Sequence, residues 1–567
     1  MTDPAPDIRE QILELADAQC SGNITEAELE TLEALLTAHP QYRREYLNYV
    51  FVHIGLAGTA QSQLLQSPET GATAAAIQPA EVTSAETDRG YLVMLIPIVC
   101  TAICLGAVGI YLIWGDLKLF HEPVITMQEQ SQYYFDESAV PPEEVASVNQ
   151  LARARWELLG DRPALTDHFQ PGTVKVTSGQ VEFAFSGGAD INVASPSLFG
   201  FERKDQGTLF SGSVSTQRSD RRERFRLETP GIELIDRGTE YEVSVNDASE
   251  TFVHVLDGQV EVKARGRLPR FFWNFDQSPV EPLMDQMGNH AVRVGNNAKL
   301  VTGLVGAGAM RFNNRPDASL LLGNGGGREV GTGDYSVSTG ITIETLLISE
   351  WKTPNEPQVK APFDYDEIFR KEDGSYRILL SFQNDDKAGI TQIPRTGNGP
   401  CLSFGLYLSG LGYSELDMPL DGKEGRPTLA EIRDGKPHHI VATYNGWTGE
   451  KAIYIDGVLR MSHRFPVGTI IISGGAAPAV IGNLISGDSE ALIGREPFSG
   501  VIDEVAFYDY ALDAITIATH YDLFKAGKDY FDGQLNEFLR QEQQGEFLLL
   551  NKGQKMKFSA VTGKPVL

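Results

Sequence analysis

The spacing of apolar residues changes along the chain and divides it into stretches of different structure. Apolar residues recur at helical spacing in residues 1–58, and an unbroken apolar run follows from Tyr91 to Trp114. From Gly172 onward apolar and polar residues alternate in short runs between turn-forming residues. Because helices have a period of 3.6 residues and strands a period of two, this pattern predicts a multidomain protein with a small all-α domain, one transmembrane helix and two all-β domains.

The first 58 residues predict three short amphipathic helices. Ile8 and Ile12 lie on one face of the first helix. Thr25 and Glu28 form a capping box at the start of the second helix, and a third helix begins at Pro40. Helices this short bury little apolar surface, which favours a partner or self-association.

The same 58 residues resemble the helical cytoplasmic domain of membrane-bound anti-sigma regulators, in the variety without zinc, since no HxxxCxxC motif occurs. A helical hairpin without any partner is the alternative interpretation. Residues 59–90 are rich in Ala, Thr, Ser, Gln and Glu and lack apolar periodicity, so they predict a flexible linker.

Residues 91–114 predict the transmembrane helix. They contain no charged residue and would extend about 36 Å as a helix, enough to cross a hydrocarbon core of about 30 Å. Aromatic residues stand at both ends, and a proline falls in the second turn, where a kink is tolerated. A buried core helix is the alternative. The residues that define the predicted span are Tyr91, Pro97, Cys100, Cys104 and Trp114.

Charge restricts the function but not the orientation in the membrane. The chain has 48 basic and 76 acidic residues, a net charge of −28, which argues against nucleic-acid binding because such binding requires a basic face. Arg89 precedes the span and Lys118 follows it, each alone among the 20 neighbouring residues on its side. The excess of positive charge that marks a cytoplasmic side is therefore missing, and charge leaves the orientation open.

Residues 115–165 predict a juxtamembrane stalk with an amphipathic helix at 141–159. Val145 and Val148 fall on one face of this helix, and Gly160 suits its C-terminal end.

Residues 166–266 predict an all-β domain of short strands, since period-two alternation runs through them without a helical interruption. Three of their segments resemble the FecR family: RLETPG from Arg226, IDRGTEYEV from Ile235 and VHVLDGQVEV from Val253. Glycines in these motifs permit turns, and we interpret the motif residues as structural. They are Thr229, Pro230, Asp236, Gly238, Thr239 and Gly258.

FecR-like proteins transmit an extracytoplasmic signal across the membrane to a sigma factor. The resemblance therefore implies a single-pass protein of the inner (cytoplasmic) membrane with a cytoplasmic N-terminus. It places the bulk of the chain in the periplasm or outside the cell, and it implies a cytoplasmic sigma factor as partner.

Residues 270–522 predict a second all-β domain, with apolar alternation on both sides of tight turns, as in two packed antiparallel sheets. The segments from His439 to Gly457 and from Phe498 to Leu512 resemble the LamG family of concanavalin A-like jelly rolls. The resemblance implies an extracellular glycan or protein ligand, bound in some members through calcium at the rim of a sheet. The motif residues, interpreted as structural, are His439, Tyr444, Asp456, Gly457, Gly500, Asp503 and Glu504.

The residue pattern predicts that the protein is not an enzyme. A glycoside hydrolase on a jelly roll needs two carboxylates about 5–9 Å apart on one face. Asp503 and Glu504 are neighbours in a strand and should point to opposite faces, and His438 and His439 diverge for the same reason. We therefore expect no catalytic residue and no cofactor, with calcium in the LamG-like domain left open.

Two functions fit these observations. The first is a membrane signal transducer that relays an extracytoplasmic binding event to a sigma factor. The alternative is a membrane-anchored glycan- or protein-binding surface protein without sigma-factor regulation. Residues 523–567 predict a polar tail with a helix at Phe538–Gln544 and carry no predicted role.

Overall fold

The structure, a computed structural model, describes residues 143–566 except for short gaps, together with five positions nearer the N-terminus. The chain divides into two units, Met1–Leu119 and Phe120–Leu567, and the strands described below belong to the second. The gaps lie at 161–167, 217–223, 237, 267, 278–282, 289–291, 314–317, 323–329, 354–364, 375, 386–390, 483–497 and 544–547.

Most of the elements predicted for the first 142 residues lie outside the described residues. This holds for the linker at 59–90, for the predicted transmembrane helix with Tyr91, Pro97, Cys100, Cys104 and Trp114, and for most of the predicted all-α domain. Among the residues that the structure describes, no helix has both the length and the apolar character needed to cross a membrane. The five described positions are all helical: Gln11, Leu15, Thr31, Leu32 and Leu35.

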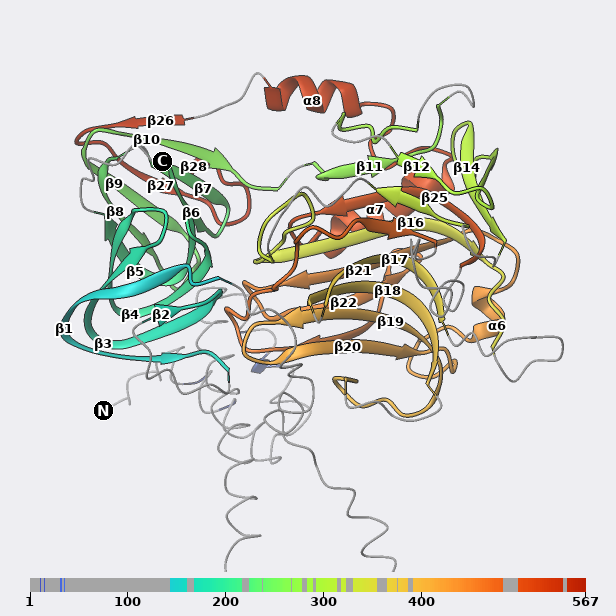
Figure 1. The fold of residues 1–567 in the computed structure, drawn as a ribbon, viewed down its shortest axis with the longest axis horizontal. Helices are drawn as coiled ribbons and strands as arrows, with labels where there is room; N and C mark the ends of the chain where they lie inside the picture. Colours follow the sequence, from blue (N-terminus) through green and yellow to red (C-terminus); the bar gives the residue numbers. More distant parts are fainter. Residues whose placement is uncertain are drawn as a thin grey trace, which may run out of the picture. The chain divides into compact units, whose positions relative to one another are not determined.

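The first β domain is a strongly curved sheet that begins with strands β1 to β10, antiparallel except where β5 pairs with β6 in parallel (Figure 1). Neighbouring strands follow the order β2-β1-β3-β4-β5-β6-β7-β10, and β8 pairs with both β5 and β9. Buried and exposed residues alternate along these strands, which confirms the predicted strand pattern. The strands are β1 (Ala146–Leu158), β2 (His168–Phe169), β3 (Gly172–Phe185), β4 (Asp190–Arg203), β5 (Gln206–Thr216), β6 (Phe225–Thr229), β7 (Ile232–Asp236), β8 (Glu240–Val245), β9 (Thr251–Asp257) and β10 (Gln259–Ala264).

Strand β1 occupies the stretch for which an amphipathic helix was predicted, residues 141–159, so that prediction is wrong. β1 pairs with β3, with Trp156 opposite Val176. Ala154, Trp156 and Leu158 pack against the core in steps of two, and the residues between them are charged. This alternation is a strand signal, and the helical spacing of the apolar residues nearer the start of the segment concealed it.

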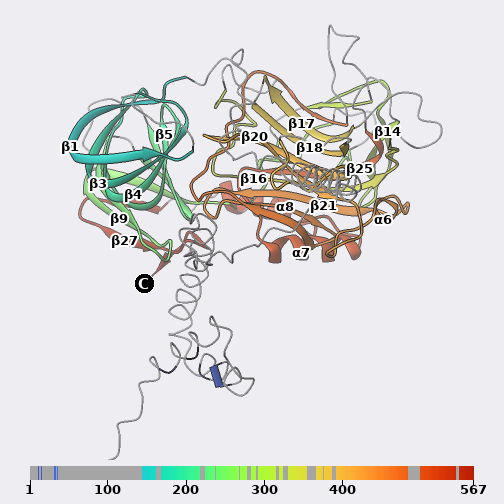
Figure 2. The same ribbon diagram turned by 90° about the horizontal axis from the view of Figure 1, so that it is seen from below.

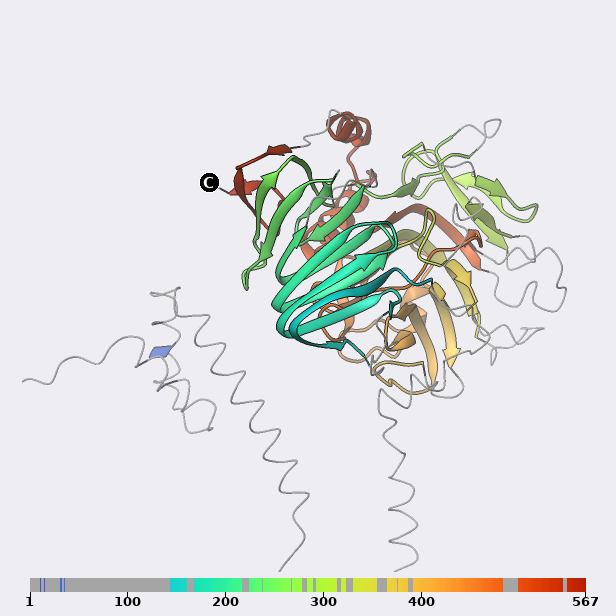
Figure 3. The same cartoon turned by 60° about the vertical axis from the view of Figure 1, so that its left-hand side comes forward.

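The end of the chain returns to the first β domain and completes its sheet (Figure 3). Antiparallel pairs join β26 to β10, β27 to β9 and β28 to β27. Leu550 and Phe558, each 1% exposed, enter the core formed by the earlier strands. The second β domain is therefore inserted between β10 and β26. The returning strands are β26 (Leu548–Asn551), β27 (Lys555–Phe558) and β28 (Pro565–Val566).

The second β domain consists of two stacked sheets, as predicted for residues 270–522. One sheet has eight strands in the order β13-β14-β25-β16-β21-β22-β23, with β11 paired to β25, and the other has seven in the order β12-β15-β24-β17-β18-β19-β20. The first sheet contains β11 (Phe271–Trp273), β13 (Lys299–Thr302), β14 (Gly308–Asn313), β16 (Gly340–Ser349), β21 (His438–Asn445), β22 (Glu450–Ile455), β23 (Val458–Arg464) and β25 (Ser499–Tyr508). The second contains β12 (Val292–Val294), β15 (Leu320–Leu322), β17 (Tyr365–Asp373), β18 (Tyr376–Asp385), β19 (Gly399–Leu408), β20 (Gly412–Pro419) and β24 (Ala479–Ile481).

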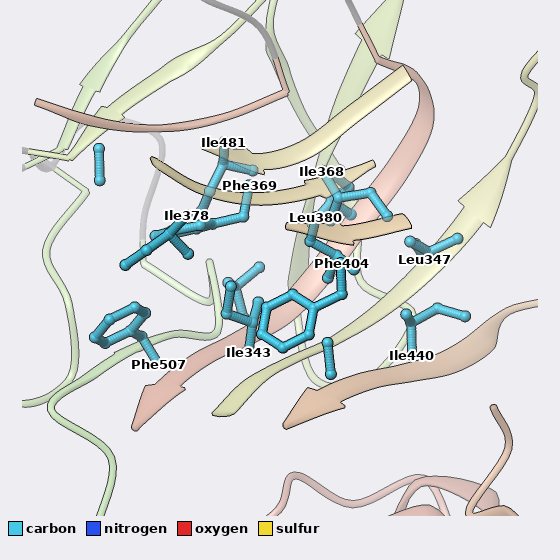
Figure 4. Close-up of a cluster of buried hydrophobic side chains, with 14 of the residues drawn as sticks. Ile343, Leu347, Ile368, Phe369, Ile378, Leu380, Phe404, Ile440, Ile481 and Phe507 are labelled. Atoms are coloured by element: carbon cyan, nitrogen blue, oxygen red, sulfur yellow. The ribbon is translucent and has the colours of Figure 1, made fainter. Parts of the chain in front are cut away.

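The inner faces of the two sheets form an apolar core (Figure 4). Ile343, Ile440 and Phe507 project from the eight-stranded sheet toward the seven-stranded one (Figure 4). Phe404 and Ile481 face them from the other side, and all five side chains are fully buried. Burial of apolar side chains from both sheets is the main force that holds such a sandwich together.

Helix α7 (Ala514–Lys525) and the segment after it, with Tyr530 and Phe531, cover part of the outer face of the eight-stranded sheet (Figure 2). α7 packs there through Ile517, in a cluster with Phe272 and Tyr508. α8 (Leu535–Gln543) confirms the helix predicted near residues 538–544. The short α6 (Leu429–Ile432) carries a complete capping box between Thr428 and Glu431. Because both faces are covered at the centre of this sheet, β16 and β25 are buried almost along their whole length, whereas β13 and β23 are partly exposed.

Candidate functional site: the contact between the two β domains

The two β domains meet through a buried set of polar side chains. Glu202 stands near the end of β4 and Glu228 in β6, and both face the segment just before β16 of the second domain. Ser338 donates a hydrogen bond to Glu202. Thr339 Oγ1 donates a hydrogen bond to Glu228 Oε2 at 3.0 Å. Two carboxyl groups of the FecR-like region thus accept hydrogen bonds from two hydroxyl groups of the sandwich.

Gln206 holds these two carboxyl groups together on the side of the first domain. Its Nε2 donates to Glu202 Oε2 and to Glu228 Oε1, each at 2.8 Å. Arg203 donates to Gln206 Oε1 at 2.6 Å, and Thr208 donates to Glu202. The two glutamate side chains are therefore held in position by hydrogen bonds within the first domain alone.

Arg265, which follows β10, links the same network to the second domain. Its guanidinium lies 2.8 Å from Glu228 Oε2 and donates to Thr339 Oγ1 at 2.9 Å. The guanidinium also lies 5.5 Å from the ring of Trp447, which packs against Phe210 with the ring centroids 4.8 Å apart. Arg265 thus makes a charge-assisted hydrogen bond with the first domain and a cation–π contact with Trp447 of the second. Trp447 in turn packs against Phe210 of the first domain.

A second patch of the contact depends on close backbone approach. Thr173 Oγ1 donates to the Gly468 carbonyl at 2.6 Å, across 295 residues of sequence. A Cβ atom on Gly160 would lie 2.7 Å from the Cα of Gly410, so glycine is required where these two segments touch. A hollow lined by residues of both domains, Glu202 and Ser338 among them, has a volume of only about 20 Å³, room for about one water molecule.

Burial shifts the protonation of both carboxyl groups. Desolvation, followed by the neighbouring Glu228, raises the pKa of Glu202 to about 8. Desolvation also raises the pKa of Glu228, although Arg265 opposes that shift. The Gln206 amide group binds both carboxyl groups, so they lie close together, and two negative charges there would repel each other. A proton on Glu202 removes this repulsion and stabilises the contact near neutral pH.

The predicted FecR motif residues form a network of turns in the first domain, away from this contact. Asp236 Oδ1 accepts the Thr239 N–H at 2.6 Å, and Thr239 Oγ1 donates to the Gln259 carbonyl at 2.8 Å. Gly238 and Gly258 both have φ of 85°, a conformation that favours glycine. These contacts join the β7–β8 and β9–β10 turns, so the geometry gives the four motif residues structural roles.

Thr229 and Pro230 lie at the β6–β7 turn. The Thr229 hydroxyl donates to the Ile232 carbonyl at 3.3 Å and accepts from Thr251 Oγ1 at 2.9 Å. The Pro230 carbonyl lies 3.4 Å from the same Thr251 hydroxyl. The turn is thereby tied to the start of β9.

The predicted LamG motif residues near β21 and β22 also serve the local fold. The Asp456 carboxylate binds His438 Nδ1 at 2.9 Å and the His439 N–H at 3.0 Å, and Gly457 completes the turn with φ of 73°. The buried Tyr444 hydroxyl donates to a backbone carbonyl 2.7 Å away. His438 and His439 bind different carboxylates, in keeping with the prediction that they diverge.

Asp503 and Glu504 are both buried in β25, but among the described residues only the Asp503 carboxyl group accepts hydrogen bonds. Asp503 Oδ2 accepts the N–H groups of Leu304 and Val305, at 2.9 and 3.2 Å, and burial raises its pKa to about 7. Glu504 has φ of 49°, and burial, with the neighbouring Asp503 carboxyl group, raises the pKa of its carboxyl group well above the usual range. Gly500 has φ of 141°, where a Cβ atom would lie 1.9 Å from a β16 carbonyl oxygen.

Glu344 of β16 anchors helix α7 to the outer face of the sheet. It binds His439 Nε2 at 2.8 Å, His520 Nδ1 at 2.9 Å and the Tyr508 hydroxyl at 3.2 Å. Desolvation alone would raise the pKa of Glu344, but His520 and His439 lower it to about 2. Among the described residues, no group of three or more His, Cys, Asp or Glu side chains is arranged to hold a metal ion.

Sequence analysis missed the residues of the domain contact. Glu202 lies in a run of buried residues near the end of β4, and a charged residue in such a run is a signal of a buried polar partner; the same signal marks Glu344 within the sandwich. Arg265 carries no such signal, because its partners lie 37 residues or more away in sequence, as with Glu228, or in the inserted domain.

Two family models match separate parts of the chain. The FecR protein model matches residues 173–261, and the model of the concanavalin A-like lectin/glucanases superfamily matches residues 377–518. The chain therefore combines a FecR domain with a concanavalin A-like jelly-roll domain, as the sequence predicted. No curated protein matches the chain.

Several solved structures resemble a little under half of the chain. The binding domain of botulinum neurotoxin serotype G is 13% identical, with a TM-score of 0.31, over 45% of this chain and 51% of that chain. Domain 4 of AbnA, a GH43 extracellular arabinanase from Geobacillus stearothermophilus, in complex with arabinotriose, is 19% identical, with a TM-score of 0.29, over 44% and 97%. The binding domain of Paraclostridial Mosquitocidal Protein 1 is 13% identical, with a TM-score of 0.32, over 46% and 55%. The match spans about half the length of the first and third of these chains, and likenesses this weak carry no argument about function.

Proposed function

We propose that the protein is a single-pass signal transducer of FecR type. In this proposal the jelly-roll domain binds a ligand outside the cytoplasm and the FecR domain receives the change. The helical residues 1–58 act on a cytoplasmic sigma factor, on the far side of the helix at 91–114. The observation that supports it best is the buried contact between the two matched domains, centred on Glu228, Arg265 and Thr339.

The chemistry of that contact suits a relay. A ligand shifts an equilibrium only if it binds one state better than another, so the receiving domain needs a contact with the binding domain that can change. A contact held by hydrogen bonds between carboxyl, hydroxyl and guanidinium groups can be rearranged with little loss of apolar burial. A purely apolar contact would fuse the domains into one permanent core.

The proposed outer ligand is a glycan or a protein, and the proposed action on it is binding without catalysis. The buried carboxyl groups of the LamG motif support this view, because Asp503 already serves the backbone of residues 304–305. Calcium at the rim of a sheet is part of the proposal only as an optional aid to ligand binding.

The test uses the full chain with an affinity tag at its N-terminus, expressed in its own host and recovered from the membrane fraction. We expect a protein of sigma-factor sequence to co-purify with it, and to be lost when residues 1–58 are deleted. Recovery in the membrane without any sigma factor would favour the surface-binding alternative. Recovery of the intact chain in the soluble fraction would contradict both functions.

A further inference from the structure

The outer face of the FecR domain carries a groove that none of the motifs explains. The groove is a hollow of about 560 Å³ lined by residues of strands β3, β4, β5, β8, β9 and β27. Its last wall is β27, so the groove is complete only when the end of the chain has returned to the domain.

Cross-strand pairing shows how the groove arises. One row of outward-facing residues runs directly across the sheet, each opposite the next: Gln180, Ala194, Ser213, Ser244, Phe252 and Lys557. Small side chains occupy the middle of this row and long ones its ends. Because neighbouring strands lie about 4.8 Å apart, the row spans about 24 Å. Because the small side chains lie between the long ones, the surface is lower in the middle of the row, and this forms a trough perpendicular to the strands.

A second, parallel row supplies polar partners. In it Asn192 lies opposite Ser215, and His254 lies opposite Lys555. Asn192 Oδ1 is buried and accepts no hydrogen bond from the residues that the structure describes. A buried acceptor without a donor costs free energy unless water or a ligand satisfies it. The polar groups that the groove itself presents to a ligand are the side chains of Ser213, Ser215 and Ser244, with the Asn192 side chain beside them.

An exposed aromatic ring marks one end of the trough. Phe252 is 40% exposed, with Lys557 Nζ 6.0 Å from its ring centroid. Lys557 is already paired with Glu250 at 3.0 Å, and His254 lies 3.3 Å from Glu242. Most of the charged side chains along the groove are thus paired with one another. The groups left to contact a ligand are the face of the Phe252 ring and the neighbouring hydroxyl and amide groups.

We propose that this groove binds an oligosaccharide that lies across β4, β5 and β8 and stacks on Phe252. A sugar chain offers many hydroxyl donors together with the apolar face of its rings, which matches Asn192, the serines and Phe252 in turn. A peptide added as an extra strand is disfavoured, because the backbones under the groove are already paired on both sides. The volume falls within the range of small-molecule sites, about 300–1,000 Å³.

This site is separate from the ligand site proposed for the jelly-roll domain, and the test must distinguish them. The full chain, purified in detergent, is titrated calorimetrically with three probes: chitohexaose, cellohexaose and hexagalacturonate. We expect at least one probe to bind and Phe252→Ala to weaken it about tenfold, the value of one lost stacking contact. Ser244→Trp, which fills the trough, should abolish binding.

The matched control is Leu549→Ala, which removes a side chain of similar exposure, 44%, on the neighbouring strand β26, outside the groove. It should leave the affinity unchanged. Binding that survives both Phe252→Ala and Ser244→Trp would place the sugar elsewhere on the chain and overturn the proposal. Failure of all three probes, or binding of a peptide at the groove in their place, would overturn it as well. Loss of sigma-factor capture would not affect it.

Discussion

The interior of the jelly roll and its contact with the FecR domain are both buried, yet they are built from opposite materials. Between the two sheets lie rings and aliphatic chains such as Phe507, Phe404 and Ile343. Between the two domains lie Glu202, Glu228 and Arg265, joined by hydrogen bonds, with the single ring pair Phe210–Trp447 beside them. The comparison teaches that stability and domain arrangement depend on different interactions. Apolar burial stabilises each domain, and a polar network determines how the two domains contact each other.

The largest effect is expected from a change in the apolar core. Phe507 is fully buried between the sheets. Phe507→Ala should lower the free energy of unfolding by about 3–5 kcal/mol, through lost burial and a cavity. Urea unfolding followed by tryptophan fluorescence measures this. Leu459→Ala, at a side chain that is 46% exposed in the same domain, should change stability by less than about 0.5 kcal/mol. Equal losses in the two variants would refute the assignment of the core.

The returning end of the chain should be nearly as sensitive. Phe558 is 1% exposed in the core of the FecR domain. Phe558→Ala should cost about 3 kcal/mol and should expose β26–β28 to proteolysis. Limited trypsin digestion, with mass spectrometry of the fragments, tests this against Leu549→Ala. A digestion pattern like that of the wild type would show that the last strands are not part of the domain.

Removal of the arginine at the domain contact should have an intermediate effect and leave each domain folded. Arg265→Met leaves Glu228 without its cation, at a cost of about 2 kcal/mol after allowance for partial exposure of the pair. Calorimetry should then resolve two unfolding transitions, where a coupled wild type shows one. The double variant with Glu228→Gln should recover part of the loss, because the unpaired charge is then gone. An unchanged single transition in Arg265→Met would show that the network does not couple the domains.

The fourth expected effect is a dependence on pH that the apolar core should lack. Burial raises the pKa of Glu202 from its usual 4.5 to about 8, so the folded protein retains a proton that the unfolded chain releases. The stabilisation is complete below pH 4.5 and declines as the pH rises through 8, with a slope of at most about 1.4 kcal/mol per pH unit. Thermal unfolding between pH 5 and 9 should show the wild type losing stability relative to Glu202→Gln. Parallel curves for the two proteins would contradict this role of the proton.

Local sequence pattern predicts the strands of both β domains but not their partners. Apolar and polar residues alternate along β3 and β6 to β10, so these strands are recognisable in the sequence. The strands β16, β21 and β25 are recognisable from their motifs. The pairing of β10 with β26 is not accessible in this way, because Gln259 and Asn551 are 292 residues apart and nothing local marks them as neighbours. The domain contact was missed for the same reason, since Glu202 and Ser338 carry no pattern that joins them.

The most direct test of the transducer hypothesis is sigma-dependent transcription in cells that carry the full chain. RNA sequencing compares the wild type, Arg265→Met and the surface control Leu459→Ala, at equal protein levels in the membrane fraction. We predict that Arg265→Met changes the transcripts of the co-purified sigma factor several-fold, whereas Leu459→Ala leaves them as in the wild type. The same transcript levels in all three strains, with the domain contact shown by calorimetry to be broken in Arg265→Met, would contradict a relay through this contact.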